Sequence, residues 1–108
     1  MIPDGVKRIE KGCFKGLLSL KEVTLPSSLD SIGSLAFFGC VSLSNISIPS
    51  STRTIGDEAF ASCYMLERIE MPETILVVGK NVFKDCKMLG KNYSSSIPVG
   101  SDVMDGMN

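Results

Sequence analysis

The sequence predicts an α/β-type repeat solenoid, a stack of four 23-residue coils with a parallel β-sheet along one side. Proline recurs at a strict spacing of 23 residues, and phenylalanine recurs at the same spacing eleven positions later in every repeat. Cysteine occupies a third column in three of the four repeats. The columns are Pro3, Pro26, Pro49 and Pro72; Phe14, Phe37, Phe60 and Phe83; and Cys40, Cys63 and Cys86.

The strand of each repeat is predicted from a short apolar pattern that ends in proline. LKEVTLP, LSNISIP and LERIEMP place apolar residues in alternation, as in a half-buried strand. Proline cannot donate to a sheet ladder, so each strand ends there. The sequence therefore predicts parallel strands near residues 20–25, 43–48 and 66–71.

The rest of each coil is predicted to turn and then to form a short helical segment. LDSIG ends in a glycine, Gly33, which can adopt a positive φ and turn the chain. SLAFFGC and DEAFASC then resemble one helical or 3-10 turn, with Ala36 and Cys40 four residues apart on one face. We expect these turns on the side of the coil away from the sheet.

The expected stacking predicts which repeated residues are buried. Since one coil cannot bury its own apolar edge, neighbouring coils are expected to bury the four phenylalanines in one ladder. The cysteines of the column are expected to be reduced, buried and free of metal, because parallel Cα–Cβ bonds cannot bring two sulfur atoms to disulfide geometry. Cys13, in the alanine column, is expected to be buried as well.

The repeated pattern L-x-x-I-x-I-P-x-x-L-x-x-I-G-x-x-A-F-x-x-C resembles the BspA-like (Treponema-type) leucine-rich repeat. The resemblance implies a right-handed superhelix with its parallel sheet on the concave face, and binding of a protein or extracellular-matrix ligand. It also implies a cell-surface or secreted location. The predicted domain is 1–93, with repeats 2–24, 25–47, 48–70 and 71–93, and 94–108 form a Ser/Gly-rich tail or degenerate cap.

Composition argues against several functions. A net charge of −1 without a basic block lacks the electrostatic footprint of a nucleic-acid binder. No apolar run approaches the roughly 20 residues that span a bilayer, so membrane insertion is not expected. The chain has no histidine, the commonest general base, and no phosphate-binding glycine loop. We therefore expect no catalysis, no cofactor and no metal.

Polar residues between the apolar strand positions form a candidate binding face, which we call the polar face. A solvated sheet surface without a ligand is the alternative interpretation. The nine residues are Lys21, Glu22, Thr24, Ser44, Asn45, Ser47, Glu67, Arg68 and Glu70.

Apolar residues outside the repeat columns form a candidate association patch, with partial burial between coils as the alternative. Leu76 and Val77 occupy columns that are polar in the other repeats, so we expect either the tail or a second copy of the chain to cover them. The patch comprises Leu18, Leu35, Phe38, Val41, Tyr64, Leu76 and Val77. A homo-oligomer through the solenoid ends is thus a possible assembly.

The sequence favours a non-catalytic interaction module of adhesin type, a fragment or short member of a surface repeat family. The alternative is a set of structural spacer repeats that carry another domain of a larger protein.

Overall fold

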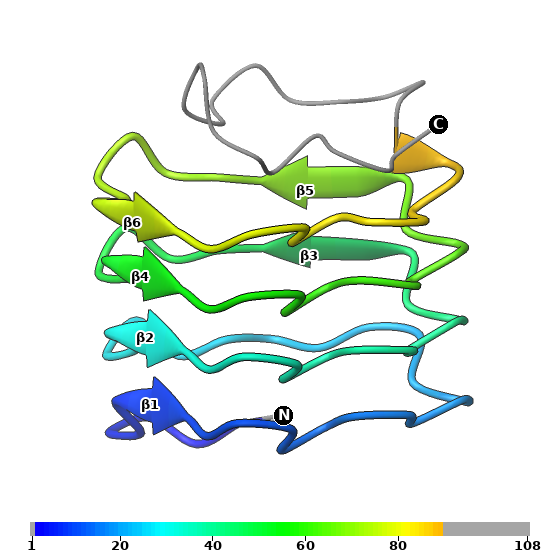
Figure 1. Cartoon of the computed structure of the whole chain (residues 1–108). Helices are drawn as coiled ribbons and strands as arrows, with labels where there is room; N and C mark the ends of the chain where they lie inside the picture. The colour runs from blue at the N-terminus through cyan, green and yellow to red at the C-terminus, as the bar shows by residue number, and fades with distance from the viewer. Residues whose placement is uncertain (1, 90–108) are drawn as a thin grey trace.

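The chain is a stack of flattened coils with a parallel sheet on each of its two broad faces (Figure 1). The structure is a computed structural model, and it describes residues 2–89. The strands of the first sheet are β1 (Arg8–Ile9), β2 (Ser31–Ile32), β4 (Thr54–Ile55) and β6 (Val77–Val78). Those of the second are β3 (Asn45–Ser47) and β5 (Arg68–Glu70).

All strand pairs are parallel, and their register is the 23-residue repeat itself. Ile9 pairs with Ile32 and Ile32 with Ile55, while Ile46 pairs with Ile69. The predicted parallel stacking is therefore confirmed. The right-handed twist and the concavity of the sheet stay predictions.

The predicted sheet is one of two, and it is the smaller one. β3 and β5 lie inside the predicted strands 43–48 and 66–71, but no strand forms over 20–25. The four-stranded sheet is formed by the segment that precedes Gly33 and by its equivalents in the other coils. For this segment the sequence pattern predicts only a turn. Each of the first three strands of this sheet buries one isoleucine, as Ile32 does at 1% exposure, so this segment also contributes an inward edge to the core.

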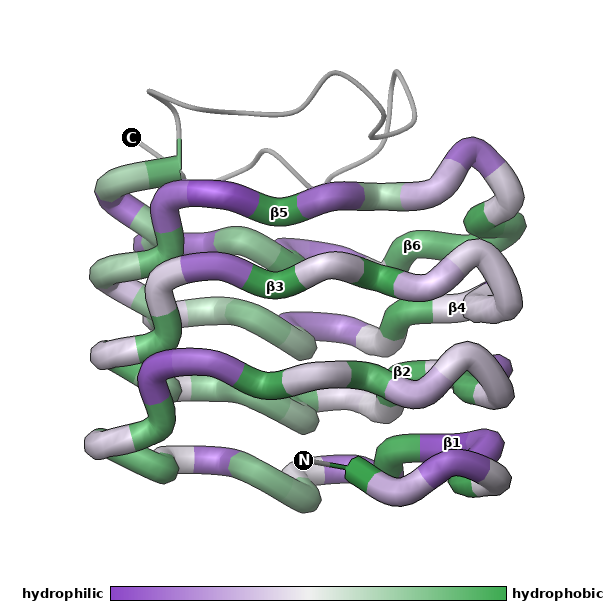
Figure 2. Tube along the Cα trace, turned by 180° about the vertical axis from the view of Figure 1, so that it is seen from behind, coloured by the Kyte–Doolittle hydropathy of each residue, from purple (hydrophilic) through white to green (hydrophobic). Residues whose placement is uncertain are grey.

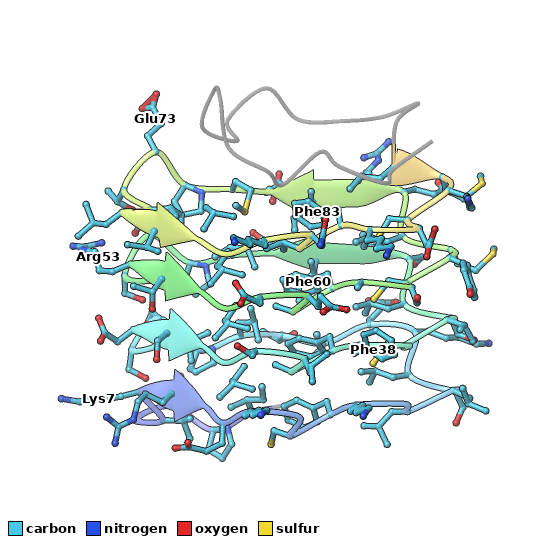
Figure 3. All side chains as sticks on the ribbon, viewed as in Figure 1. Lys7, Phe38, Arg53, Phe60, Glu73 and Phe83 are labelled. Atoms are coloured by element: carbon cyan, nitrogen blue, oxygen red, sulfur yellow. The ribbon has the colours of Figure 1, made fainter. Side chains whose placement is uncertain are left out.

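The phenylalanine ladder forms the centre of the stack. Phe37, Phe60 and Phe83 are fully buried. From Phe14 to Phe83, the centroids of successive rings lie 5.2, 5.2 and 5.9 Å apart. Figure 3 shows Phe60 and Phe83 one above the other. The prediction of complete burial is wrong for Phe14, which is half-buried because a coil covers it on one side only.

The predicted helical or 3-10 segments are consecutive turns, and residues 2–89 contain no α-helix. Two residues in each turn adopt a left-handed conformation, such as Glu58 at φ 55° and Ser62 at φ 61°. Alternate N–H groups bond to the next coil, as when Phe37 donates to the Ala59 carbonyl at 2.7 Å. The N–H groups between them keep local bonds to the carbonyl three residues before, as when Cys40 donates to the Phe37 carbonyl at 3.1 Å. Bonds within the turn thus alternate with bonds between coils, and Ala36 and Cys40 still face the core.

The glycine that recurs in the second, third and fourth repeats serves close packing rather than a positive φ. Gly33, Gly56 and Gly79 do not have a positive φ, so that prediction is wrong. A Cβ atom on Gly56 would lie 2.5 Å from the Ser34 nitrogen, and one on Gly33 would lie 2.7 Å from the Lys11 nitrogen. The absent side chain lets successive coil backbones approach each other.

Candidate functional site

The sheet of β3 and β5 presents the centre of the polar face to solvent. Asn45 pairs with Arg68 and Ser47 with Glu70, and all four side chains are exposed while Ile46 between them is buried. Figure 2 shows this face, where hydrophilic positions lie on both sides of a hydrophobic one along β5 and on one side of it along β3. The period-2 pattern of the sequence therefore oriented these residues correctly.

Backbone hydrogen bonds between coils align the remaining polar-face residues with those of β3 and β5. The Ser44 N–H donates to the Lys21 carbonyl at 3.2 Å, and the Glu67 N–H donates to the Ser44 carbonyl at 2.8 Å. Lys21, Glu22 and Thr24 are exposed in the first coil. The rows thus cross three successive coils.

Two open hollows lie along this face. The larger, which we call the polar hollow, measures about 560 Å³ and is lined by Ser44, Asn45, Ile46, Ser47, Glu67, Arg68 and Glu70. A neighbouring hollow of about 390 Å³ shares Asn45, Ile46 and Ser47 with it and adds Glu22 and Thr24. The structure therefore brings together all of the predicted face residues along these hollows except Lys21, which lines neither.

The polar hollow combines charged and neutral hydrogen-bonding groups. Asn45 Nδ2 donates to Ser44 Oγ at 3.3 Å, and the amide oxygen of this exposed side chain can accept a hydrogen bond. Among residues 2–89, the side-chain salt bridges join Arg8 to Glu10 and Asp85 to Lys87, away from this hollow. Arg68 and the neighbouring glutamates are therefore open to a ligand.

The cysteine column is a buried ladder of thiol hydrogen bonds. Sγ of Cys40, Cys63 and Cys86 donates to a phenylalanine carbonyl in the coil below, at 3.2, 3.2 and 3.0 Å. Burial raises the pKa of the Cys40 thiol, and contact with Cys86, together with burial, raises the pKa of the Cys63 thiol. Since the thiolate is the reactive form, these groups are poor nucleophiles.

Cys13 departs from the expected burial. Cys13 is exposed, whereas Ala36 and Ala59 of the same column lie between two described coils and are buried. Within residues 2–89 no three His, Cys, Asp or Glu side chains gather into a metal-binding group.

The residues of the candidate association patch do not form one surface. Leu76 and Val77 are 75% and 57% exposed at β6, at one edge of the stack. Leu18 and Tyr64 are exposed in the bend that follows the cysteine column and precedes the strands of the second sheet. Val41, in the same bend, is half-buried. Leu35 and Phe38 are half-buried too, and Lys15 Nζ lies 5.7 Å from the Phe38 ring centroid.

Sequence reasoning missed an apolar hollow under the first coil, which we call the basal groove. It measures about 370 Å³. Its lining includes several residues of the repeat columns whose equivalents in the later coils are buried. The lining residues are Ile2, Pro3, Val6, Arg8, Ile9, Cys13, Phe14, Leu17, Leu20, Glu22 and Val23. The signal was present in the columns, because Phe14, Leu17 and Leu20 belong to columns whose members in the second and third coils lie between two described coils.

In the described part of the chain, no helix has the length and apolar character needed to cross a membrane.

Comparison with known proteins agrees with a repeat solenoid of the leucine-rich class. The family model described as "BspA type Leucine rich repeat region" matches residues 1–103 in six copies. The chain therefore belongs to the BspA-type leucine-rich repeat family, and the resemblance inferred from the repeat motif is confirmed.

Two solved structures share the fold. A leucine-rich repeat protein from Bacteroides ovatus is 42% identical with a TM-score of 0.77, over 82% of this chain and 23% of that one. The T. pallidum leucine-rich repeat protein TpLRR is 39% identical with a TM-score of 0.77, over 81% of this chain and 42% of its own. The chain thus spans less than half the length of either relative. No match was found among curated proteins.

Proposed function

We propose that this chain is a non-catalytic protein-binding module that binds its ligand across the polar face. Leucine-rich repeat domains generally mediate protein interactions, which gives the class of function. The observation that supports this particular surface is the polar hollow, where outward-facing residues of β3 and β5 meet in register.

The chemistry of the hollow favours a polypeptide ligand that donates hydrogen bonds. Glu67 and Glu70 accept from cationic or N–H groups, while Arg68 between them accommodates a carboxylate or a backbone carbonyl. Ser44, Asn45 and Ser47 offer neutral polar groups beside them. The aromatic anchors that dominate tight interfaces are missing from these rows, so we expect modest affinity.

An adhesin role at a cell surface is the finer form of the proposal. It rests on family membership and on the similarity to repeat proteins from Bacteroides and Treponema. The ligand would then be a host or extracellular-matrix protein. Spacer repeats that carry another domain are the competing role, and they predict that substitutions on the polar face leave binding unchanged.

Surface plasmon resonance against a panel of immobilised extracellular-matrix proteins tests the proposal. Ser47→Arg places a bulky cation in the polar hollow and should weaken binding roughly tenfold, about 1.4 kcal/mol. Ser50→Arg is the matched control, since Ser50 is also an exposed serine but does not line the hollow. Equal binding by both variants, or no binding by the wild type, would support the spacer role instead.

A further inference from the structure

Along β5 the polar face carries a cation and an anion two residues apart. Arg68 and Glu70 are both exposed, and Ile69 between them is buried. Because side chains alternate along a strand, the two project from the same face, with their Cα atoms roughly 6.5 Å apart. An extended polypeptide has the same two-residue spacing on each of its faces, so it can match both charges at once.

These two charges are not neutralised within the described part of the chain. No ion pair or side-chain hydrogen bond within residues 2–89 involves Arg68 or Glu70. Both side chains line the polar hollow. A ligand that enters the hollow therefore meets a guanidinium and a carboxylate that no described side chain occupies.

The neighbouring strand explains why the surface is hollow here. In register with Arg68 and Glu70, β3 presents Asn45 and Ser47, whose side chains are shorter. Neighbouring strands lie about 4.8 Å apart, so the short row forms a floor beside a wall of longer side chains. The polar hollow, of about 560 Å³, is lined by both rows. It offers room for a polypeptide backbone over β3 while the side chains of that polypeptide reach β5.

The floor is neutral and offers hydrogen-bond donors and acceptors. Asn45 has an amide oxygen in addition to the N–H group that it donates to Ser44 Oγ, and the Ser47 hydroxyl has no partner among residues 2–89. Peptide groups are likewise uncharged, and each carries one donor and one acceptor. Since the backbones of β3 and β5 already pair with each other, a ligand lies across this face rather than between the two strands.

We propose that the polar face binds an extended polypeptide segment that has an acidic and a basic side chain two residues apart. The acid of the segment pairs with Arg68 and the base with Glu70, while the backbone lies over Asn45 and Ser47. This inference rests on the proposed function and deepens it, because it names the chemistry that the same surface selects. A segment parallel to β5 has the acid before the base, and an antiparallel segment has the reverse order.

NMR titration of the full chain with acetylated and amidated peptides tests the spacing. The two probes have the cores Thr-Glu-Thr-Lys-Thr and Thr-Lys-Thr-Glu-Thr, and the control has Thr-Thr-Glu-Lys-Thr, with the same composition and charge. Adjacent side chains of a strand point to opposite faces, so the control presents only one charge at a time. We expect one probe to bind with a dissociation constant of about 1 mM or less, and the control to bind roughly three- to tenfold more weakly.

Charge reversal tests the two ion pairs. Glu70→Lys should weaken binding of the better probe roughly three- to tenfold. Glu73→Lys is the matched control, because Glu73 is an exposed glutamate outside the hollow, and Figure 3 shows it projecting away from the stack. The double variant Arg68→Glu/Glu70→Arg keeps the net charge and should reverse the preferred order of acid and base. Circular dichroism melts verify that the variants fold.

Three results would overturn this inference: equal binding of probes and control, no binding of either probe at millimolar concentration, or an unchanged preference in the double variant. The proposed function would survive any of them if Ser47→Arg still weakens binding to a matrix protein. Discrimination between the peptides, with no effect of Ser47→Arg on matrix binding, would support the peptide site and count against a matrix protein as its ligand.

Discussion

At the scale of single residues, burial within a repeated column decides how much each side chain contributes to the stability of the fold. Phe37, Phe60 and Phe83 have the same chemistry as Phe14, yet only Phe14 is partly open to solvent. The sequence repeat makes these positions equivalent, and their place in the stack makes them differ.

Phe60→Ala should lower the free energy of unfolding by about 3–5 kcal/mol, because it leaves a cavity between two stacked rings. Phe14→Ala should cost about 1–2 kcal/mol, since less of its surface leaves water on folding. Urea unfolding followed by circular dichroism measures both. Equal losses of unfolding free energy for the two variants would mean that the contribution of a ring does not depend on how deeply it is buried.

The buried thiols predict a loss of stability at alkaline pH. Their raised pKa values mean that the folded state disfavours the thiolate, so the stability they contribute is complete below the unfolded pKa of about 8.5 and is lost as pH rises above it. Between pH 8.0 and 9.5 we therefore expect the free energy of unfolding to fall, because the Cys40 and Cys63 thiols ionise more readily in the unfolded state than in the folded one.

Urea unfolding at several pH values checks this expectation. Cys63→Ala should make the decline smaller, whatever its effect at neutral pH, and Cys13→Ser, which replaces an exposed cysteine, is the control variant. A pH profile identical in all three proteins would contradict the assignment.

At the scale of the element, the turn between the two sheets depends on left-handed residues. Gly12, Gly16 and Gly39 adopt positive φ in the first two coils, whereas Leu35, Glu58 and Ser62 do so with a side chain. An L-residue in this conformation costs roughly 1–2 kcal/mol, so the later coils contain strain that glycine would relieve.

Ser62→Gly should raise the free energy of unfolding by about 0.5–1 kcal/mol, since relief of the left-handed strain exceeds the added chain entropy of glycine. Gly39 already fills the equivalent position one coil earlier, at φ 74°. Ser62→Ala is the control that removes the hydroxyl but keeps the strain. Thermal unfolding should rank glycine above serine and alanine, and a glycine variant no better than alanine would refute the explanation.

At the scale of the whole molecule, a stack in which each coil contacts only its neighbours is least protected at an uncovered end. Residues 2–89 show this at the basal groove, where the first coil packs on one side only. Opening of that coil exposes less apolar surface than opening of the second or third.

Hydrogen exchange should therefore be faster for the Phe14 N–H than for the Phe37 and Phe60 N–H groups, although all three donate to the next coil at 2.7–3.0 Å. Mass spectrometry of exchanged peptides, or NMR, measures the order. Uniform exchange along the stack would show that the coils open together.

The sequence predicted much of the candidate site but less of the surrounding backbone. Period-2 alternation correctly oriented Asn45, Ser47, Arg68 and Glu70 outward, because side-chain direction in a strand follows from local geometry alone. The basal groove was missed, because the exposure of Phe14 and Leu17 depends on which neighbour is lacking and not on either residue's own pattern.

By itself, the sequence determined the 23-residue period, the parallel register, the buried Phe and Cys columns, and the family. These follow because identical residues at a fixed spacing have one efficient way to bury their apolar edges, which is to stack. Only the tertiary structure decided that the turns are left-handed rather than helical, that the Gly56 column permits backbone contact, and that a second sheet forms. Each of these depends on hydrogen bonds between coils, and local propensity cannot reveal where a backbone N–H finds a partner 20 or more residues away.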